Sequence, residues 1–108
     1  MAAPLPSVTL SVCIPTPHGR RALLAAALET IAVSAGQSGA RVEVVVSDNA
    51  SRDGTDEMVA AFAQAHPTLQ VVYGRNDHDQ RLGNIMRVVE RATGDWCWLF
   101  GSDDTMEP

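Results

Sequence analysis

The sequence of 108 residues lacks the features that mark membrane-spanning, secreted and repetitive proteins. No apolar run approaches the roughly 18 residues of a membrane-spanning helix, and no basic segment precedes an apolar one near Met1. Internal repeats and low-complexity segments are absent too. The composition, 45% hydrophobic and 19% charged, is ordinary for a soluble globular domain. We therefore expect one folded domain, or a piece of a larger one, in a reducing, cytoplasmic setting.

Basic residues and cysteines are also scarce. Eight basic residues against 13 acidic ones give a formal net charge of −5, which argues against a protein that binds nucleic acid by neutralising its phosphates. The two cysteines, Cys13 and Cys97, lie in separate apolar segments without the spacing of a zinc site. We expect buried free thiols at both positions and no disulfide.

Short β-branched runs alternate with segments of helical periodicity along the whole chain. Strands are predicted over residues 8–14, 42–46, 69–73 and 96–100. Helices are predicted from after Gly19 until Gly36 and Gly39 break the pattern, between Thr55 and His66, and over residues 85–92. Short connections and right-handed crossovers then predict an α/β fold, with a mostly parallel sheet and helices on both faces.

Several local expectations follow from the residue types in these elements. Pro15 and Pro17 should end the first strand, because proline lacks a backbone donor. Thr55 is a suitable N-cap for the second helix. Trp96 and Trp98 alternate on the last strand, where core packing is favoured over ligand stacking. The third helix should bury the residues that recur at helical spacing, namely Ile85, Val88, Val89 and Ala92.

Polar residues collect where the predicted strands end. Ligands of open parallel sheets bind beyond the carboxyl ends of the strands, which here carry Pro15, Thr16, Asp48, Asn49, Ser102, Asp103 and Asp104. Neighbouring carboxylates repel one another, so a cluster of them is stable chiefly when a cation or several donors face it. Sparse carboxylate ligands suit Mg²⁺ or Mn²⁺. Asp103 and Asp104 are therefore candidate metal ligands.

Each of these segments also has a structural interpretation that the sequence leaves open. Residues 101–105 can form an acidic turn that caps a following helix, and residues 48–55 can form an Asx-type turn before a capped helix. Arg20, Arg21, Arg75 and Arg81 can bind a diphosphate or remain solvated charges. The histidines, which lack ligand spacing, are expected to be solvated or to cap helices: His18, His66 and His78.

Three segments, in order and at suitable spacing, resemble the nucleotide-sugar-binding half of a GT-A glycosyltransferase of family 2. They span residues 11–16, 45–55 and 92–104, and the last is most similar to abequosyltransferase-like enzymes of bacterial surface polysaccharide synthesis. The resemblance covers nearly the whole chain. It implies that residues 1–108 are the N-terminal part of a family domain that breaks off after the DxD-type motif.

The resemblance implies roles for individual residues. Pro15 and Thr16 would line the nucleoside pocket, and Asp48 would hold the base. Asn84 would support the site from the start of the third helix. Together with Asp103, which would lie near the ribose or diphosphate, the implied substrate-binding residues are Pro15, Thr16, Asp48, Asn49, Asn84 and Asp103.

The implied metal site departs from the usual family pattern. Asp104, with Asp103 beside it, would bind Mg²⁺ or Mn²⁺, while Ser102 stands where many relatives have the first acid. Residues 17–18 are Pro-His where the family usually has Tyr-Asn, and residues 78–80 replace an Asn-x-Gly. The general base of the family lies well downstream of the DxD-type motif, so it is expected beyond Pro108 and no catalytic residue is assigned.

The implied activity is transfer of a sugar from a nucleotide-diphosphate donor to a glycan or lipid-linked acceptor, with inversion of the anomeric centre. The 108-residue piece alone is expected to bind the donor without turnover. The alternative is a non-catalytic nucleotide-binding or assembly module of the same fold. A phospho-receiver domain needs acids where Pro15 and Thr16 lie, and a dinucleotide oxidoreductase needs a glycine motif after strand one. An uncovered sheet edge predicts self-association. The expected location is the cytoplasm, including a peripheral place at the inner membrane face for the full-length protein.

Overall fold

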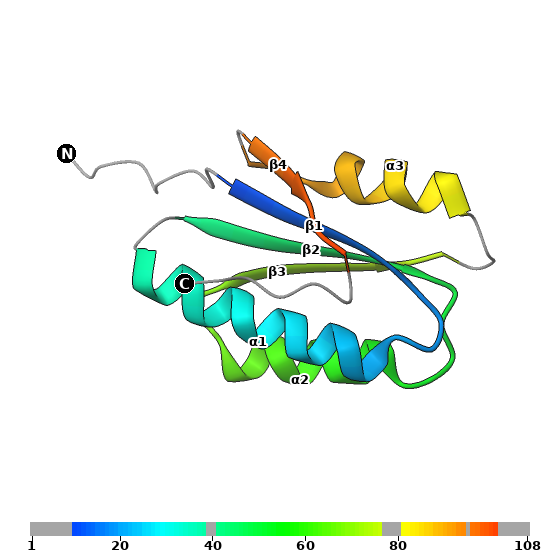
Figure 1. Ribbon diagram of the computed structural model, residues 1–108, viewed down its shortest axis with the longest axis horizontal. Coiled ribbons are helices and arrows are strands. Elements are labelled where there is room, and N and C mark those ends of the chain that lie inside the picture. Colours follow the sequence, from blue (N-terminus) through cyan, green and yellow to red (C-terminus); the bar gives the residue numbers. More distant parts are fainter. Residues whose placement is uncertain (1–9, 39–40, 77–80, 95, 102–108) are drawn as a thin grey trace.

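The computed structural model describes residues 10–38, 41–76, 81–94 and 96–101. The elements are β1 (Leu10–Pro17), α1 (Arg21–Ser38), β2 (Val42–Asn49), α2 (Thr55–Ala65), β3 (Gln70–Arg75), α3 (Arg81–Arg91) and β4 (Trp96–Leu99). The four strands form one parallel sheet in the order β3-β2-β1-β4 (Figure 1). The predicted α/β class is confirmed. Within the described ranges, no helix combines the length and apolarity needed to cross a membrane.

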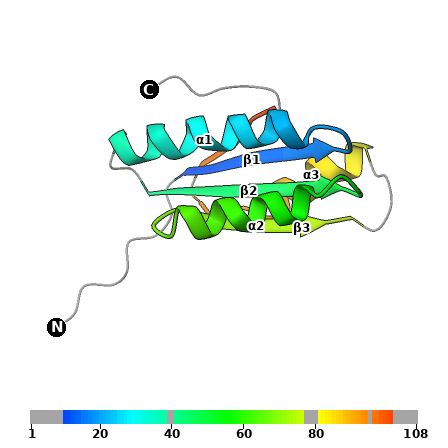
Figure 2. The same cartoon turned by 90° about the horizontal axis from the view of Figure 1, so that it is seen from below.

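Helices cover both faces of the sheet, as predicted. α1 and α2 lie side by side on one face, and α3 lies on the other (Figures 1 and 2). Val44 and Val46 of β2 belong to the larger core beneath α1 and α2, whereas Val45 belongs to a smaller core with Cys13 and Val88 on the α3 side. Because successive side chains of a strand point to opposite faces, both sides of β2 must be apolar. This explains its continuous β-branched run.

β1 continues through Pro15 and Pro17, so the prediction that these prolines end the strand is wrong. The backbone groups of a parallel strand alternate between its two neighbours. The amide of Leu10 donates on the β2 side, whereas the carbonyl of Cys13 accepts on the β4 side. Pro15 and Pro17 therefore face the β4 side, where β4 ends opposite Cys13. Neither proline removes a hydrogen bond from the described sheet.

α1 matches its prediction in packing and ends directly before Gly39, one of the two glycines predicted to break it. Four of its predicted apolar residues are fully buried, although Leu23 is 45% exposed: Leu24, Ala27, Leu28 and Ile31. The helix also runs past Gly36 to residue 38. An α-helix tolerates one glycine at a cost of about 1 kcal/mol, so Gly36 does not end it.

α3 faces the sheet with a different set of side chains from the predicted one. Val88 is buried, but Ile85 and Val89 are 41% and 44% exposed. Asn84, one turn before Val88, is only 4% exposed. A polar contact through Asn84 replaces part of the expected apolar contact, because the Asn84 side chain hydrogen-bonds to Ser47 of β2.

β4 lies at the edge of the described sheet, and its side chains are exposed. Trp96 and Trp98 are 74% and 46% exposed, so the predicted core packing of both tryptophans is wrong. Trp98 contacts the ring of Phe100 edge-on, with centroids 5.4 Å apart. Cys97 is exposed as well, which corrects the prediction that it is buried. Only β1 pairs with β4 among the described elements, and this explains the exposure.

Candidate functional site

The carboxyl edge of the sheet brings together the predicted residues of β1 and β2. Thr16 is the register partner of Asp48, and Pro17 is the partner of Asn49. Asp48 in turn pairs with Arg75 at the end of β3. Both strands thus run beyond their predicted ends, and the polar residues expected in loops belong to the sheet. This fixes their positions more firmly than a loop would.

Asp48 is fully buried and closes the turn that follows β2. Its Oδ1 accepts a hydrogen bond from the Ser51 amide (3.0 Å), and its Oδ2 accepts bonds from the Ser51 and Tyr73 hydroxyls (2.5 Å each). The turn interpretation of this segment is therefore correct for Asp48. Burial, together with the Asp48 carboxylate, raises the pKa of Tyr73. Three of the carboxylate's roughly four acceptor positions are used.

Asn49 points to the opposite face of β2, because adjacent strand residues alternate. Its side chain is half-buried, and its Oδ1 accepts a hydrogen bond of 3.2 Å from Asn76 Nδ2. Asn76 Nδ2 also donates to Asn84 Oδ1 at 2.9 Å. The predicted residues Asn49 and Asn84 are thus linked through Asn76, which sequence analysis did not identify.

Asn84 anchors the start of α3 to β2. Its Nδ2 donates to the Ser47 carbonyl (2.9 Å), and its Oδ1 accepts from the Ser47 hydroxyl (2.7 Å). Arg91 Nη1 donates to the same hydroxyl oxygen at 2.7 Å. A Cβ atom at Gly74 would lie 2.3 Å from Arg91 Cζ, so this glycine leaves room for the guanidinium. The expected supporting role of Asn84 has a clear structural basis here.

The loops after β1 and β2 are joined by hydrogen bonds at the same edge. Asp53 Oδ2 accepts a bond of 3.0 Å from the Gly19 amide, and His18 Nδ1 accepts one of 3.0 Å from the Arg52 amide. The Thr55 hydroxyl donates to Asp53 Oδ1 at 2.5 Å, and this bond is the main reason that the pKa of Asp53 is lowered. These bonds hold the two loops in a fixed relation.

Thr55 does not cap α2, which corrects the prediction. The N-cap position is Gly54, whose φ of 83° lies in the left-handed region. Thr55 is the first helical residue, and its hydroxyl is taken by Asp53. Gly54 provides a backbone conformation that other residues adopt only with strain, so the turn needs a glycine at the capping position.

The other arginines and histidines considered in the sequence analysis lie at different edges of the sheet. Arg20, Arg21 and Arg75 are exposed near the carboxyl edge, where they remain available to an anion. His66 lies at the far end of α2, with its Nε2 atom 3.4 Å from Glu29 Oε2. The side chain of Arg81, together with His78, lies outside the described residues.

The predicted metal ligands Asp103 and Asp104 also lie outside the described residues, as does Ser102. In the described part of the chain, no group of three His, Cys, Asp or Glu side chains could hold a metal ion. The donor set that the sequence offers consists of carboxylate oxygens, which fit Mg²⁺ or Mn²⁺ in kind.

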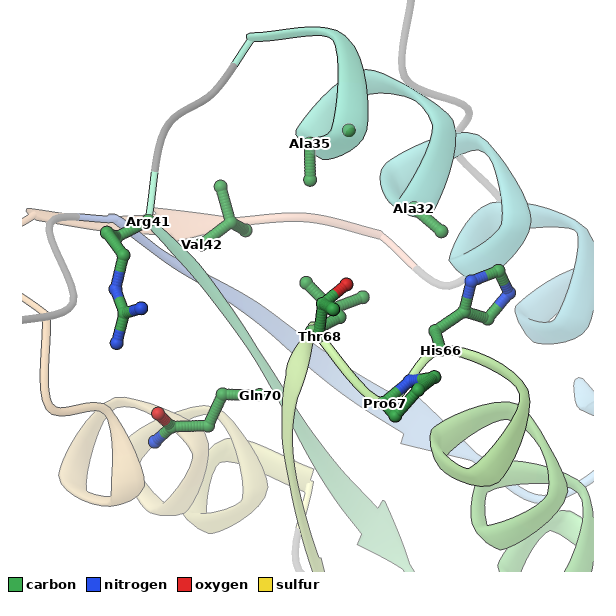
Figure 3. A pocket seen from close by; sticks show the side chains of 10 residues that line it. Ala32, Ala35, Arg41, Val42, His66, Pro67, Thr68 and Gln70 are labelled. Atoms are coloured by element: carbon green, nitrogen blue, oxygen red, sulfur yellow. The ribbon is translucent and has the colours of Figure 1, made fainter.

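The amino edge of the sheet contains features that sequence analysis missed. A cavity of about 360 Å³ opens between the ends of α1 and α2 and the starts of β2 and β3 (Figure 3). Its labelled polar side chains include Arg41, His66 and Gln70. None of the predicted substrate-binding residues that the structure describes lines it.

Glu43 is buried completely near this amino edge. Its carboxylate accepts hydrogen bonds from the Ser11 hydroxyl (2.7 Å), Gln70 Nε2 (2.9 Å), the Thr93 amide (2.9 Å) and the Thr93 hydroxyl (3.0 Å). The Ser11 hydroxyl oxygen also accepts a bond of 2.9 Å from the Gly94 amide. The sequence signal that could have identified Glu43 is its position as the one charged residue in the β-branched run of residues 42–46.

Comparison with known proteins shows which family the chain resembles. A model described as Glycosyl transferase family 2 matches residues 11–108. Abequosyltransferase RfbV of Salmonella typhimurium is 37% identical over 100 residues, which cover 90% of this chain and 28% of that protein. An uncharacterized glycosyltransferase of Mycoplasma pneumoniae, the MG060 homolog, is 33% identical over 100 residues, which cover 92% of this chain and 33% of that protein.

A solved structure agrees with these sequence matches. Mannosyltransferase PcManGT from Pyrobaculum calidifontis, in complex with GDP-Man and Mn²⁺, has a TM-score of 0.80 and 25% identity, over 92% of this chain and 28% of that one. The chain therefore spans about a third or less of each of these three proteins. The predicted fold class and the resemblance to abequosyltransferase-like enzymes are both confirmed.

Proposed function

Because the chain belongs to glycosyl transferase family 2, we propose that the full-length protein transfers a sugar from a nucleotide-diphosphate donor to a glycan or lipid-linked acceptor. The family match over residues 11–108 carries this proposal. The bound GDP-Man of the structurally similar mannosyltransferase supports it. Residues 1–108 would supply the donor-binding part of the enzyme, and the general base would follow Pro108. Direct displacement by the acceptor hydroxyl would invert the anomeric centre.

We place the donor at the carboxyl edge of the sheet, where burial separates two kinds of residue. Pro15 and Asn49 are only partly buried, so they can contact the nucleoside directly. Thr16 and Asp48 are fully buried, and Asn84 is 4% exposed. These three would act mainly by holding the edge in shape.

The diphosphate of the donor and the metal ion would lie beside the nucleoside. Asp104, with Asp103, would hold Mg²⁺ or Mn²⁺, and the Mn²⁺ of the mannosyltransferase complex supports a divalent ion. When bound, such an ion offsets the negative charge of the departing diphosphate. The exposed guanidinium groups of Arg20, Arg21 and Arg75 can add to this charge compensation.

The proposal is tested by titrating the chain with UDP, GDP, CDP and dTDP, with and without Mn²⁺. Tryptophan fluorescence and thermal stability report binding. We expect one nucleotide diphosphate to bind in a metal-dependent way and Asp104→Asn to abolish the metal dependence. Glu90→Gln, which removes one exposed negative charge on α3, is the matched control and should bind normally. A folded chain that binds none of the four would contradict the proposal.

We also propose that the isolated 108-residue chain associates with itself through β4. Its four residues are all exposed, and β1 is the only strand that pairs with β4 in the described sheet. An apolar edge strand favours pairing with another strand. Sedimentation at increasing concentration should reveal oligomers that Trp96→Ser weakens. Val33→Ser, on the exposed side of α1, should not weaken them. A monomer at all concentrations would contradict association.

A cytoplasmic location, including the inner face of the membrane for the full-length protein, remains our proposal. The free thiols of Cys13 and Cys97 are compatible with a reducing compartment. Fractionation of cells that express the full-length protein would test it. Recovery from a compartment outside the cytoplasmic membrane would contradict it.

A further inference from the structure

Cys13 and Cys97 approach each other across the boundary between β1 and β4. Cys97 is the register partner of Ser11, and Cys13 follows two residues later on the same strand face. The two Sγ atoms are 2.7 Å apart. A disulfide bond measures about 2.05 Å, so the sulfurs would need to approach by only about 0.7 Å more. The pair is thus arranged for a cross-link, although both cysteines are free thiols.

The two thiols differ in access to solvent. Cys13 is fully buried beside Val45 and Val88, whereas Cys97 is exposed on the edge strand. Burial, followed by the neighbouring Cys97 sulfur, raises the pKa of Cys13 to about 12. Cys13 therefore stays protonated near neutral pH, and a reagent in solution meets Cys97 first.

We propose that Cys13 and Cys97 form a thiol–disulfide exchange site that reacts with low-molecular-weight disulfides such as oxidised glutathione. The Cys97 thiolate attacks one glutathione sulfur, which forms a mixed disulfide and releases one reduced glutathione. The Cys13 sulfur then attacks Cys97 Sγ, and its proton passes to the departing glutathione sulfur, which releases the second reduced glutathione. Two protein thiols are oxidised to one disulfide, and one glutathione disulfide is reduced to two thiols.

The cross-link would tie an edge strand to a central one. β4 pairs in register with β1 at four positions, from Leu10 to Cys13. It is followed in the sequence by Phe100, Gly101 and an acidic segment. A disulfide between residues 13 and 97 closes most of the chain into a loop, which raises the melting temperature by roughly 10 °C or more. The reaction is independent of the proposed transferase function.

Mass spectrometry of the folded chain after treatment with oxidised glutathione tests this inference. The reaction is quenched with acid, and intact mass and peptide mapping are measured. We expect the wild-type chain to lose two hydrogen atoms and to yield joined peptides that contain Cys13 and Cys97. Dithiothreitol should restore both thiols, and the higher melting temperature of the oxidised chain should fall back.

Two variants separate the roles of the thiols. Cys13→Ala should retain one glutathionyl group on Cys97, because no second thiol can displace it. Cys97→Ala should stay unmodified while folded, and urea should expose Cys13 to the reagent. The inference is overturned if the wild-type chain keeps two free thiols or carries glutathione as stably as Cys13→Ala does. Because Cys97 is exposed, its variant should fold and keep the test valid.

Discussion

β2 carries a fully buried carboxylate near each end, and the two differ in the partners they bind. Asp48, at the carboxyl edge, is bound by Ser51 of its own turn and by Tyr73 of the adjacent strand. Glu43, near the amino edge, is bound by side chains and an amide from β1, β3 and the turn after α3, as far away as Thr93. One carboxylate shapes a loop, and the other joins distant elements.

The difference teaches that burial of a carboxylate does not by itself mark a functional site. Glu43 has four hydrogen bonds and lies at the edge opposite the predicted donor residues. The cavity lies at that amino edge too, so its size is no better guide. Our proposal for the donor site rests on topology instead, because polar residues from separate strands converge at the carboxyl edge. Substitutions at Glu43, Gly94, Tyr73 and Asp53 test the separate roles of the two edges.

Glu43→Ala should destabilise the protein most, by roughly 3–4 kcal/mol, because buried donors lose their charged partner. Urea unfolding measures the loss. Glu90→Ala, which removes an exposed carboxylate, is the control and should change stability little. A loss below about 1 kcal/mol for Glu43→Ala would show that its hydrogen bonds are not needed to join the elements.

Gly94→Ala should cost roughly 2 kcal/mol, because a side chain there overpacks the turn between α3 and β4. A Cβ atom at Gly94 would lie 2.7 Å from Ser11 Oγ and 3.0 Å from the Ser11 amide nitrogen. Gly36→Ala is the matched control, since a Cβ atom at that glycine has no neighbour within 4 Å. Thermal unfolding compares the two variants. Equal melting temperatures would contradict the close approach.

Tyr73→Phe should destabilise the protein by about 1 kcal/mol, because Asp48 loses the hydrogen bond from the Tyr73 hydroxyl. It keeps the bonds from the amide and the hydroxyl of Ser51. Ser51→Ala removes the other hydroxyl and should cost a similar amount. Chemical unfolding of the two variants and of their combination measures the coupling through Asp48. Strict additivity would contradict a shared carboxylate.

Asp53→Asn should have the smallest effect, a small loss of stability near neutral pH that disappears in acid. Hydrogen bonds from Thr55 and Gly19 lower the pKa of Asp53 below its ordinary value of 3.8. Its contribution to stability is therefore present above the unfolded-state value and is lost as pH falls through the lower folded-state value. Unfolding measured between about pH 5 and pH 2 should give a shallower decline for Asp53→Asn. Parallel curves would contradict this assignment.

Much of this fold follows from local sequence patterns. The β-branched runs and helical spacing predict every described element, and the strand ends identify the edge where Thr16, Asp48 and Asn49 meet. Asn84 lies near the start of α3, as the sequence predicts, and its side chain hydrogen-bonds to Ser47. These inferences succeed because periodicity and strand direction are local properties that need no knowledge of distant partners.

The remaining features depend on contacts that no local pattern contains. The persistence of β1 through Pro15 depends on which neighbour its backbone faces. The exposure of Trp96 depends on the position of β4 at the sheet edge. The partners of Glu43 lie up to 50 residues away in the sequence. Side-chain register across strands, and not residue type, determines all three.

The most direct test of the central claim is to map amide chemical shifts of the chain as a nucleotide diphosphate and Mg²⁺ are added. If the carboxyl edge binds the donor, the largest changes should occur at Thr16, Asn49 and Asn84. Amides that line the cavity at the amino edge, such as Arg41 and Gln70, should change little. The largest changes at the amino edge, or no changes in a folded chain, would contradict the account.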